Sequence, residues 1–142
     1  QIPMFEYACK VRRVVDGDTV DLTLDLGFSI FHKARVRLVG IDAPECRSLD
    51  LDHKARGMLS KQFVEDRLKG AKKIKVLTEL GKGKFGRVLG TLWADEQCIN
   101  ALLVAHNHAV KYDGEHKDTV AEAHAHNREK LIERGEFDPD MV

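Results

Sequence analysis

The segment that most constrains the fold runs from Arg35 to Glu45 and reads RVRLVGIDAPE. It begins as a strand, in which Val36, Leu38 and Val39 are interspersed with Arg35 and Arg37, a mixture typical of a half-buried β-ladder. Gly40 then permits unusual backbone angles, and Pro44 forces the residue before it out of helical space. The segment therefore predicts a strand that ends in a rigid turn.

Three charged side chains lie at or near this turn: Arg37, Asp42 and Glu45. A guanidinium beside two carboxylates is suited to holding a phosphate, a cation and a water molecule together. An ordinary charged strand end has the same composition, so this segment alone does not decide between the two interpretations.

Two further motifs narrow the choice. Residues Val14–Val20 read VVDGDTV, with Asp16 and Asp18 on either side of a glycine, and residues Lys84–Gly90 read KFGRVLG. In order and separation, the three motifs resemble the staphylococcal nuclease (thermonuclease) family, in the forms D-G-D-T-V, R-L-V-G-I-D-A-P-E and G-R-V-L-G. The resemblance extends from about Val11 to about Ala109.

The hydrophobic periodicity predicts an ordered series of short strands and helices. Alternation indicates strands at 7–16, from after Gly17 to Leu26, at 28–39, at 72–79 and at 86–94, and helical spacing indicates helices at 48–69, 101–106 and 119–134. This order is compatible with the oligonucleotide-binding (OB) fold, a five-stranded, partly open Greek-key barrel. The resemblance implies the same fold: α+β, mainly a β-barrel, with three helices.

Signals at the helix ends support these boundaries. We expect Asp52, Asn100 and the Thr119–Glu122 capping box to begin the helices, and Gly70, Asn107 and Gly135 to end them. In the last helix we expect the core-facing positions to be Val120, Ala123, Asn127 and Leu131, and we expect residues 136–142 to be frayed.

Composition limits the class of protein. The chain has 142 residues, which we interpret as a single staphylococcal nuclease-like domain over 1–142 with its core at about 7–135. It has no apolar run of about 20 residues and no signal sequence, so we expect a cytoplasmic protein without a membrane partner. We also expect a monomer. A signal that has already been removed is the open alternative. Cys9, Cys46 and Cys98 are few and far apart, which favours a reducing compartment and unpaired, inert thiols.

The formal net charge is zero, yet the basic residues are unevenly placed. A nucleic-acid-binding domain is often basic as a whole, so we expect binding here to be local rather than driven by overall charge. One run is rich in basic residues with little acid between them, and it is either a phosphate-contacting face or a solvated strand edge: Lys69, Lys72, Lys73, Lys75, Lys82, Lys84 and Arg87.

The resemblance implies a metal site. In the family, the aspartates that match Asp18 and Asp42 bind Ca²⁺, together with the main-chain oxygen of the next residue, here Ala43. Asp16 is then a nearby acid outside the ligand set. An EF-hand does not fit, because Val20 stands at the third ligand position of such a loop.

The resemblance also implies catalytic and substrate-binding roles. Arg37 and Arg87 match the residues that hold the phosphate, and Glu45 matches the general base that acts on the attacking water. Three residues match or lie near the family's substrate-binding positions: Lys84, Phe85 and Tyr112. Phe85 replaces a tyrosine, so the hydroxyl contact to a terminal phosphate is lost while the ring can still stack. Tyr112 either stacks on a base or is partly buried.

The histidines give a weaker signal. His106 and His108, like His124 and His126, are two residues apart, and such pairs do not share a helix face. We therefore expect surface histidines rather than a zinc site.

These observations favour a Ca²⁺-dependent endonuclease or phosphodiesterase that hydrolyses DNA and RNA. The resemblance implies cleavage on the 5′ side, which leaves 3′-phosphates, with single-stranded or frayed nucleic acid as the substrate. The alternative is a non-catalytic OB-fold module that binds nucleic acid. Retention of all five charged residues favours the enzyme, because a module that only binds has no need of them: Asp18, Arg37, Asp42, Glu45 and Arg87.

Overall fold

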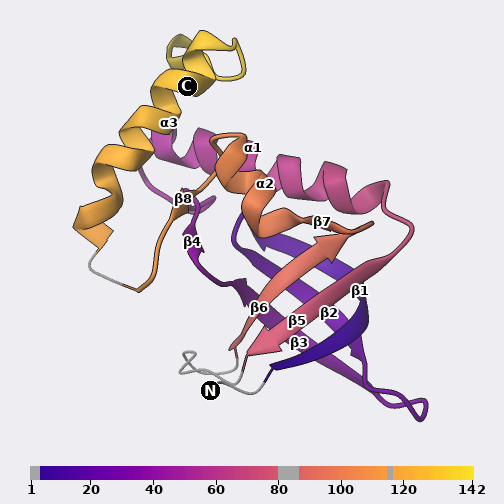
Figure 1. Ribbon diagram of the computed structural model, residues 1–142. Coiled ribbons are helices and arrows are strands. Elements are labelled where there is room, and N and C mark those ends of the chain that lie inside the picture. Colours follow the sequence, from indigo (N-terminus) through magenta and orange to yellow (C-terminus); the bar gives the residue numbers. More distant parts are fainter. Residues whose placement is uncertain (1–3, 80–86, 115–116) are drawn as a thin grey trace.

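The computed structural model describes residues 4–79, 87–114 and 117–142, and five long strands in it close into a mixed barrel (Figure 1). Neighbouring strands are antiparallel, except that β3 and β6 pair in parallel and thereby close the barrel. The barrel strands are β1 (Met4–Asp16), β2 (Thr19–Asp25), β3 (Phe31–Leu38), β5 (Ile74–Glu79) and β6 (Arg87–Ala94). The predicted OB-type α+β architecture is confirmed.

Three helices and several short elements complete the described fold. The helices are α1 (Leu51–Lys69), α2 (Ile99–Ala105) and α3 (Ala121–Glu133). The short strands are β4 (Ile41–Asp42), β7 (Gln97–Cys98) and β8 (Val110–Lys111), and the 3₁₀ turns are η1 (Lys117–Val120) and η2 (Pro139–Met141). Strands β4 and β8 form a small antiparallel pair outside the barrel, next to the turn that follows β3.

The barrel interior is filled by alternating apolar residues of the strands. Val20, Leu22 and Leu24 of β2 are buried. Leu26 does not continue this face and is 41% exposed, because β2 ends at Asp25 and Gly27 begins the turn with a φ of 83°. The hairpin between β2 and β3 extends beyond the barrel (Figure 1).

Helix α1 lies across one end of the barrel (Figure 1). Its buried residues are Gly57, Ser60, Val64 and Leu68. Asp50 caps it, because the Asp50 carboxylate accepts hydrogen bonds from the backbone N–H groups of the second and third residues that follow. The expected cap at Asp52 is wrong, since this carboxylate binds arginines instead. Gly70 ends the helix as expected.

Two of the expected helix starts are also wrong. The Asn100 side chain does not cap α2, because it bridges strands: its carbonyl accepts from the N–H of Leu92 and its amide donates to the carbonyl of Val39. Helix α3 begins at Ala121, later than expected, and its N-cap residue Val120 forms no side-chain cap hydrogen bond; Thr119 lies in η1 and Glu122 in the first turn of α3. Asn107 and Gly135 adopt the positive φ angles expected at the helix ends.

The C-terminal part packs more closely than expected. Val120, Asn127 and Leu131 are buried as predicted, whereas Ala123 is exposed. Residues 136–142 are not simply frayed, since Phe137 is 5% exposed.

The three cysteines do not form disulfides with one another. Cys9, Cys46 and Cys98 are unpaired thiols, as expected. Burial raises the pKa of Cys46 to about 12, with Asp16 adding to the effect, and burial raises that of Cys9 to about 11, so neither thiol is reactive at neutral pH.

Within the described ranges, the structure contains no helix long and apolar enough to cross a membrane.

Candidate active site

Two turns and one helix frame the site. The β2–β3 register pairs Thr19 with Arg37, which places Asp18 beside the end of β3, and the backbone N–H of Leu38 donates to the Asp18 carbonyl at 2.8 Å. Helix α1 sits directly on the two turns. A Cβ on Gly17 would lie 2.7 Å from Cβ of Ser60, and glycine is needed there for the close approach.

Asp18 is buried, with 7% of the residue exposed. Its carboxylate accepts hydrogen bonds from the N–H of Ala43 at 2.8 Å and from the hydroxyl of Thr19 at 3.0 Å. Burial raises the pKa of Asp18 above its ordinary value, although the Arg37 charge and both hydrogen bonds oppose the rise. The carboxylate would therefore gain from a nearby cation.

Arg37 joins the two predicted metal ligands. Its guanidinium nitrogens lie 3.5 Å from Oδ2 of Asp18 and 3.7 Å from Oδ1 of Asp42. The Arg37 side chain is 17% exposed and also donates to the carbonyl of Leu38 at 2.9 Å. The sequence motifs are thus brought together in space, with the guanidinium held between the carboxylates.

Asp42 is bound by two residues from the C-terminal region. His124 Nε2 on α3 lies 2.9 Å from Oδ2, and Lys117 Nζ on η1 lies 3.2 Å from Oδ1. Burial alone would raise the pKa of Asp42, but the hydrogen bond with His124 and the charge of Lys117 outweigh it, and the pKa is lowered. Asp42 is therefore ionised and already paired.

Glu45 faces a hollow of about 430 Å³ beside this pair. Its side chain is 60% exposed, and Oε1 lies 3.5 Å from Lys117 Nζ. The Glu45 backbone N–H donates to His53 Nε2 at 3.0 Å, which fixes the turn against the start of α1. The lining also includes Arg56 and Arg128, which share the Asp52 carboxylate. An anion entering the hollow would meet several positive groups.

The other predicted residues have separate positions. Asp16 accepts a hydrogen bond from the N–H of Cys46 at 2.9 Å and so supports the turn, in line with an outer role. Tyr112 is half-buried, and its N–H donates to the Gly40 carbonyl at 2.8 Å. Lys84 and Phe85 lie outside the described residues. The backbone of Arg87 begins β6 and pairs in parallel with Arg35, two residues before Arg37.

Sequence reasoning missed two residues at the site, Lys117 and His124. His124 was expected at the surface, yet only 14% of its side chain is exposed and it contacts Asp42. The available signal was indirect: an aspartate buried by the motif turn needs a partner, and a histidine on a late helix is one candidate.

The donor set fits a hard divalent cation. Asp42 Oδ1 is buried and has no aligned hydrogen-bond donor within the part of the chain that the structure describes. It faces Arg37 and Lys117, so this oxygen is already in a positively charged environment. Carboxylate oxygens are the ligands that Ca²⁺ prefers. The described side chains contain no group of three or more His, Cys, Asp or Glu arranged to hold a metal, so main-chain oxygen and water would have to complete the shell.

Comparison with known proteins decides the family. The model of the staphylococcal nuclease homologue family matches residues 35–132, more than half of the chain. The chain belongs to this family. The matched range contains Arg37, Asp42, Glu45 and Arg87, while Asp18 precedes it and is brought to the site by the β2–β3 register.

Three curated proteins are similar to this chain over part of their length. The chain is 34% identical to Protein ParB of Escherichia coli over 94 residues, which cover 63% of this chain and 44% of that protein. It is 29% identical over 93 residues to the thermonuclease of Staphylococcus intermedius, covering 66% and 52% respectively. It is 26% identical over 98 residues to that of Staphylococcus hyicus, covering 69% and 55%. The chain thus matches about half the length of each relative. Two of these three relatives are thermonucleases.

Proposed function

We propose that this protein is a Ca²⁺-dependent nuclease that hydrolyses phosphodiester bonds of single-stranded or frayed DNA and RNA and leaves 3′-phosphate ends. The observation that carries the proposal is the position of Arg37, within 3.7 Å of both Asp18 and Asp42, with Glu45 on the same turn. Family membership and the thermonuclease relatives support the same class of reaction.

Each residue has a role in such a reaction. Asp18 and Asp42, with the carbonyl of Ala43, would hold the cation, which when bound offsets negative charge on a phosphoryl oxygen. Arg37 donates hydrogen bonds to the phosphoryl oxygens as charge develops on them, and Arg87 is proposed as the second donor. Glu45 takes a proton from the attacking water, whose oxygen bonds to phosphorus while the bond from phosphorus to the 5′ oxygen breaks, and the leaving 5′ oxygen takes up a proton from solvent. Lys84, Phe85 and Tyr112 are proposed to contact the substrate.

The exposure of Glu45 is consistent with its proposed role. A general base must reach a water molecule, and this carboxylate lines an open hollow rather than a closed core. Its contact with Lys117 keeps it close to Asp42, since the same ammonium lies near both. Substrate phosphate and attacking water could therefore meet between Arg37 and Glu45.

The test is a cleavage assay on single-stranded DNA and RNA with Ca²⁺, with Mg²⁺ and with a chelator. We expect cleavage in Ca²⁺, none with chelator, and products that a phosphatase acting on 3′-phosphates converts to 3′-hydroxyl ends. Glu45→Gln should reduce the rate strongly, while the matched control Glu133→Gln, on the exposed side of α3, should not. Cleavage that persists in chelator would overturn the proposed metal dependence.

One observation favours the alternative, a non-catalytic OB-fold module that binds nucleic acid. Asp42 is already bound by Lys117 and His124, so a cation has to compete for this carboxylate. Oligonucleotide binding without any cleavage in Ca²⁺ or Mg²⁺ would support the binding module.

A further inference from the structure

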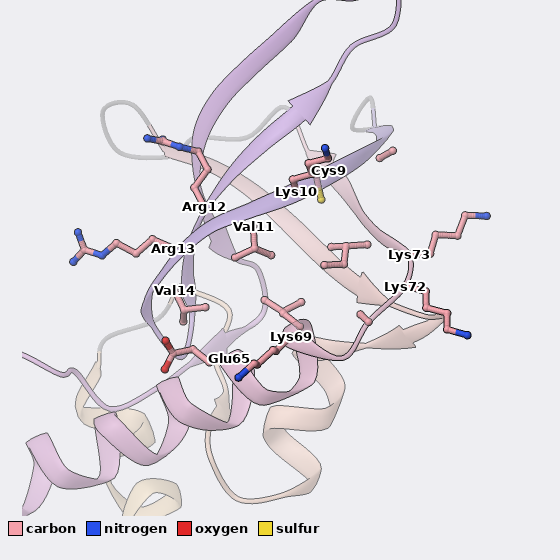
Figure 2. Close-up of a pocket in the computed structure, with 14 residues that line it drawn as sticks. Cys9, Lys10, Val11, Arg12, Arg13, Val14, Glu65, Lys69, Lys72 and Lys73 are labelled. Atoms are coloured by element: carbon pink, nitrogen blue, oxygen red, sulfur yellow. The ribbon is translucent and has the colours of Figure 1, made fainter.

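A larger hollow, of about 690 Å³, lies beside β1 and the C-terminal end of α1 (Figure 2). It arises because β1 changes partners. Residues Met4–Ala8 pair with β5, whereas the pairing with β2 begins at Cys9, and beyond Ala8 the β5 side of β1 has no strand partner among the described residues. The end of α1 fills this gap only partly. We refer to the hollow as the β1–α1 groove.

The floor of the groove is apolar. Val11 and Val14 of β1, Leu68 of α1 and Ile74 at the start of β5 line it. Val14 and Leu68 are buried, and Val11 and Ile74 are partly buried against the core. The floor is therefore a fixed surface of the folded barrel.

The rim of the groove is basic. Six exposed cationic residues line it: Lys10, Arg12, Arg13, Lys69, Lys72 and Lys73. Glu65 is the one acidic residue in the lining as described. In Figure 2, Arg12 and Arg13 project to one side of the hollow and Lys72 and Lys73 to the other. The basic run that the sequence placed near residue 70 thus joins a second basic run on β1.

Among the described residues the rim charges are largely uncompensated: Asp21 pairs directly with Arg35, which lowers the pKa of Asp21, and Arg12 and Arg13 help to lower it. None of the six side chains forms an ion pair with a described carboxylate, whereas Arg35 pairs with Asp21 and Lys75 with Glu6. Asp95 lies near Lys72 and Lys73 but accepts hydrogen bonds from their backbone N–H groups, which fixes the bend before β5. Like charges gathered in this way repel one another unless an anionic ligand offsets them. The rim is therefore complementary to a polyanion.

The groove is connected to the candidate active site by two elements. Strand β1 continues from Lys10 to Asp16, and α1 extends from the groove to the hollow that holds Glu45. At about 3.3 Å per residue the β1 path is roughly 20 Å long. This corresponds to about six nucleotides at ~3.4 Å for each stacked nucleotide. A nucleic-acid strand bound at Asp18 and Asp42 would reach the groove only if it extended several nucleotides beyond the cleaved bond.

We propose that the β1–α1 groove is a second nucleic-acid binding site, which holds the sugar–phosphate backbone of the strand beyond the candidate active site. Phosphates pair with lysines and arginines on both sides of the rim, and the apolar floor packs against the sugars. The choice of ligand rests on the proposed function, because a polymer that is cut at one site must also cover the neighbouring surface. An acidic protein segment is the competing occupant, and the experiment separates the two.

The experiment compares two double variants of equal charge change. The test variant is Lys10→Gln with Lys73→Gln, and the control is Lys33→Gln with Lys130→Gln, two exposed lysines on β3 and α3. Fluorescence anisotropy with chelator present measures binding of a 16-nucleotide and a 4-nucleotide single strand. We expect the test variant to bind the 16-mer about tenfold more weakly than the control variant does and the 4-mer equally well. The slope of log K against log salt for the 16-mer should fall by about 1.4, at roughly 0.7 for each lost phosphate contact.

Each result has a definite reading. Equal 16-mer binding by the two variants would overturn the proposal, as would displacement of the 16-mer by polyglutamate of equal charge. Thermal melting checks folding, and because all four lysines are exposed we expect parental melting temperatures. The nuclease proposal is tested separately by cleavage of a 4-mer in Ca²⁺. If the protein cleaved the 4-mer but both double variants bound the 16-mer equally well, only the groove proposal would be wrong. If the test variant bound the 16-mer more weakly but the protein cleaved nothing, only the nuclease proposal would be wrong.

Discussion

His124 Nε2 lies 2.9 Å from Oδ2 of Asp42, although 82 residues separate the two in sequence. This contact attaches α3 to the turn that carries the candidate metal ligand and the candidate base. Lys117, on the 3₁₀ turn that leads into α3, adds a second contact to the same carboxylate. The C-terminal region is therefore part of the candidate site.

The first prediction concerns Lys117. Its ammonium lies 3.2 Å from Asp42 and 3.5 Å from Glu45, so it occupies surroundings in which a cation would bind. Lys117→Met should therefore bind Ca²⁺ more tightly, by roughly thirtyfold, since a unit charge ~4 Å from a doubly charged ion in a solvated site contributes about 2 kcal/mol. Isothermal titration calorimetry measures the change.

Lys130→Met is the control for this prediction, because Lys130 pairs with Glu133 rather than with a residue of the site. We expect its Ca²⁺ affinity to equal that of the parent. Equal or weaker Ca²⁺ binding by Lys117→Met would mean that the ammonium does not compete with the cation.

Asp18, Arg37 and Asp42 could be expected to lie together because they belong to short motifs, each beside a strand end, that resemble those of a known family. A local pattern determines both the strand and its turn, so the β2–β3 pairing then brings them together. Lys117 and His124 could not be found in this way. Their positions depend on how α3 packs, and a pair of histidines two residues apart carries no local signal for that packing.

The helix starts also depend on long-range contacts that the local sequence does not reveal. Asp50 and Asp52 are both suitable caps by residue type. Long-range pairing decides between them: Arg128, 76 residues later, binds Asp52 and leaves Asp50 to cap α1. The β1–α1 groove also depends on tertiary structure, because its basic residues come from two separate runs of sequence.

The second prediction concerns the guanidinium fork of Arg37. Arg37→Lys keeps the positive charge between Asp18 and Asp42 but removes the planar two-point donor. We expect kcat to fall by ~10²–10³, the usual cost of losing one preorganised donor to a developing oxyanion. The melting temperature should change by only a few degrees, since the buried carboxylates retain a cation.

Arg35→Lys is the matched control, two residues earlier on the same strand and paired with Asp21 at the surface. It should cleave at close to the parent rate. If both lysine variants lost activity equally, the effect would come from the strand rather than from the site.

The third prediction concerns acid stability. Burial lowers the pKa of His108 to about 4 despite the opposing charge of Glu136, so the ring is neutral in the fold at pH 7. The unfolded chain binds a proton near pH 6.5, which means that the unfolded state takes up more protons than the folded state between about pH 6.5 and 4. The free energy of unfolding should therefore fall as pH falls through this window, by at most about 3 kcal/mol.

Urea unfolding at several pH values measures this effect. In His108→Phe the ring keeps its packing against Phe63 but cannot titrate, so the decline below pH 6.5 should be smaller than in the parent. An identical pH profile for the two proteins would assign the acid sensitivity to other groups.

The last prediction tests how α1 positions the candidate base. A Cβ on Gly57 would lie 2.7 Å from both the carbonyl carbon and the carbonyl oxygen of Glu45, so the helix touches the turn backbone. Alanine normally stabilises a helix interior by up to about 1 kcal/mol relative to glycine. Here the overlap should reverse the sign, and Gly57→Ala should lower the free energy of unfolding by about 1–3 kcal/mol, the usual cost of overpacking.

Gly70→Ala supplies the matched comparison, because a Cβ at that end of α1 meets nothing within 4 Å. It should be neutral or stabilising and should leave cleavage unchanged. Since Gly57→Ala displaces the Glu45 backbone, its kcat should fall while substrate affinity in chelator stays near that of the parent. Unfolding and cleavage measured on both variants decide the matter: if Gly57→Ala were as stable and as active as Gly70→Ala, the contact between α1 and the Glu45 turn would not control the position of the base.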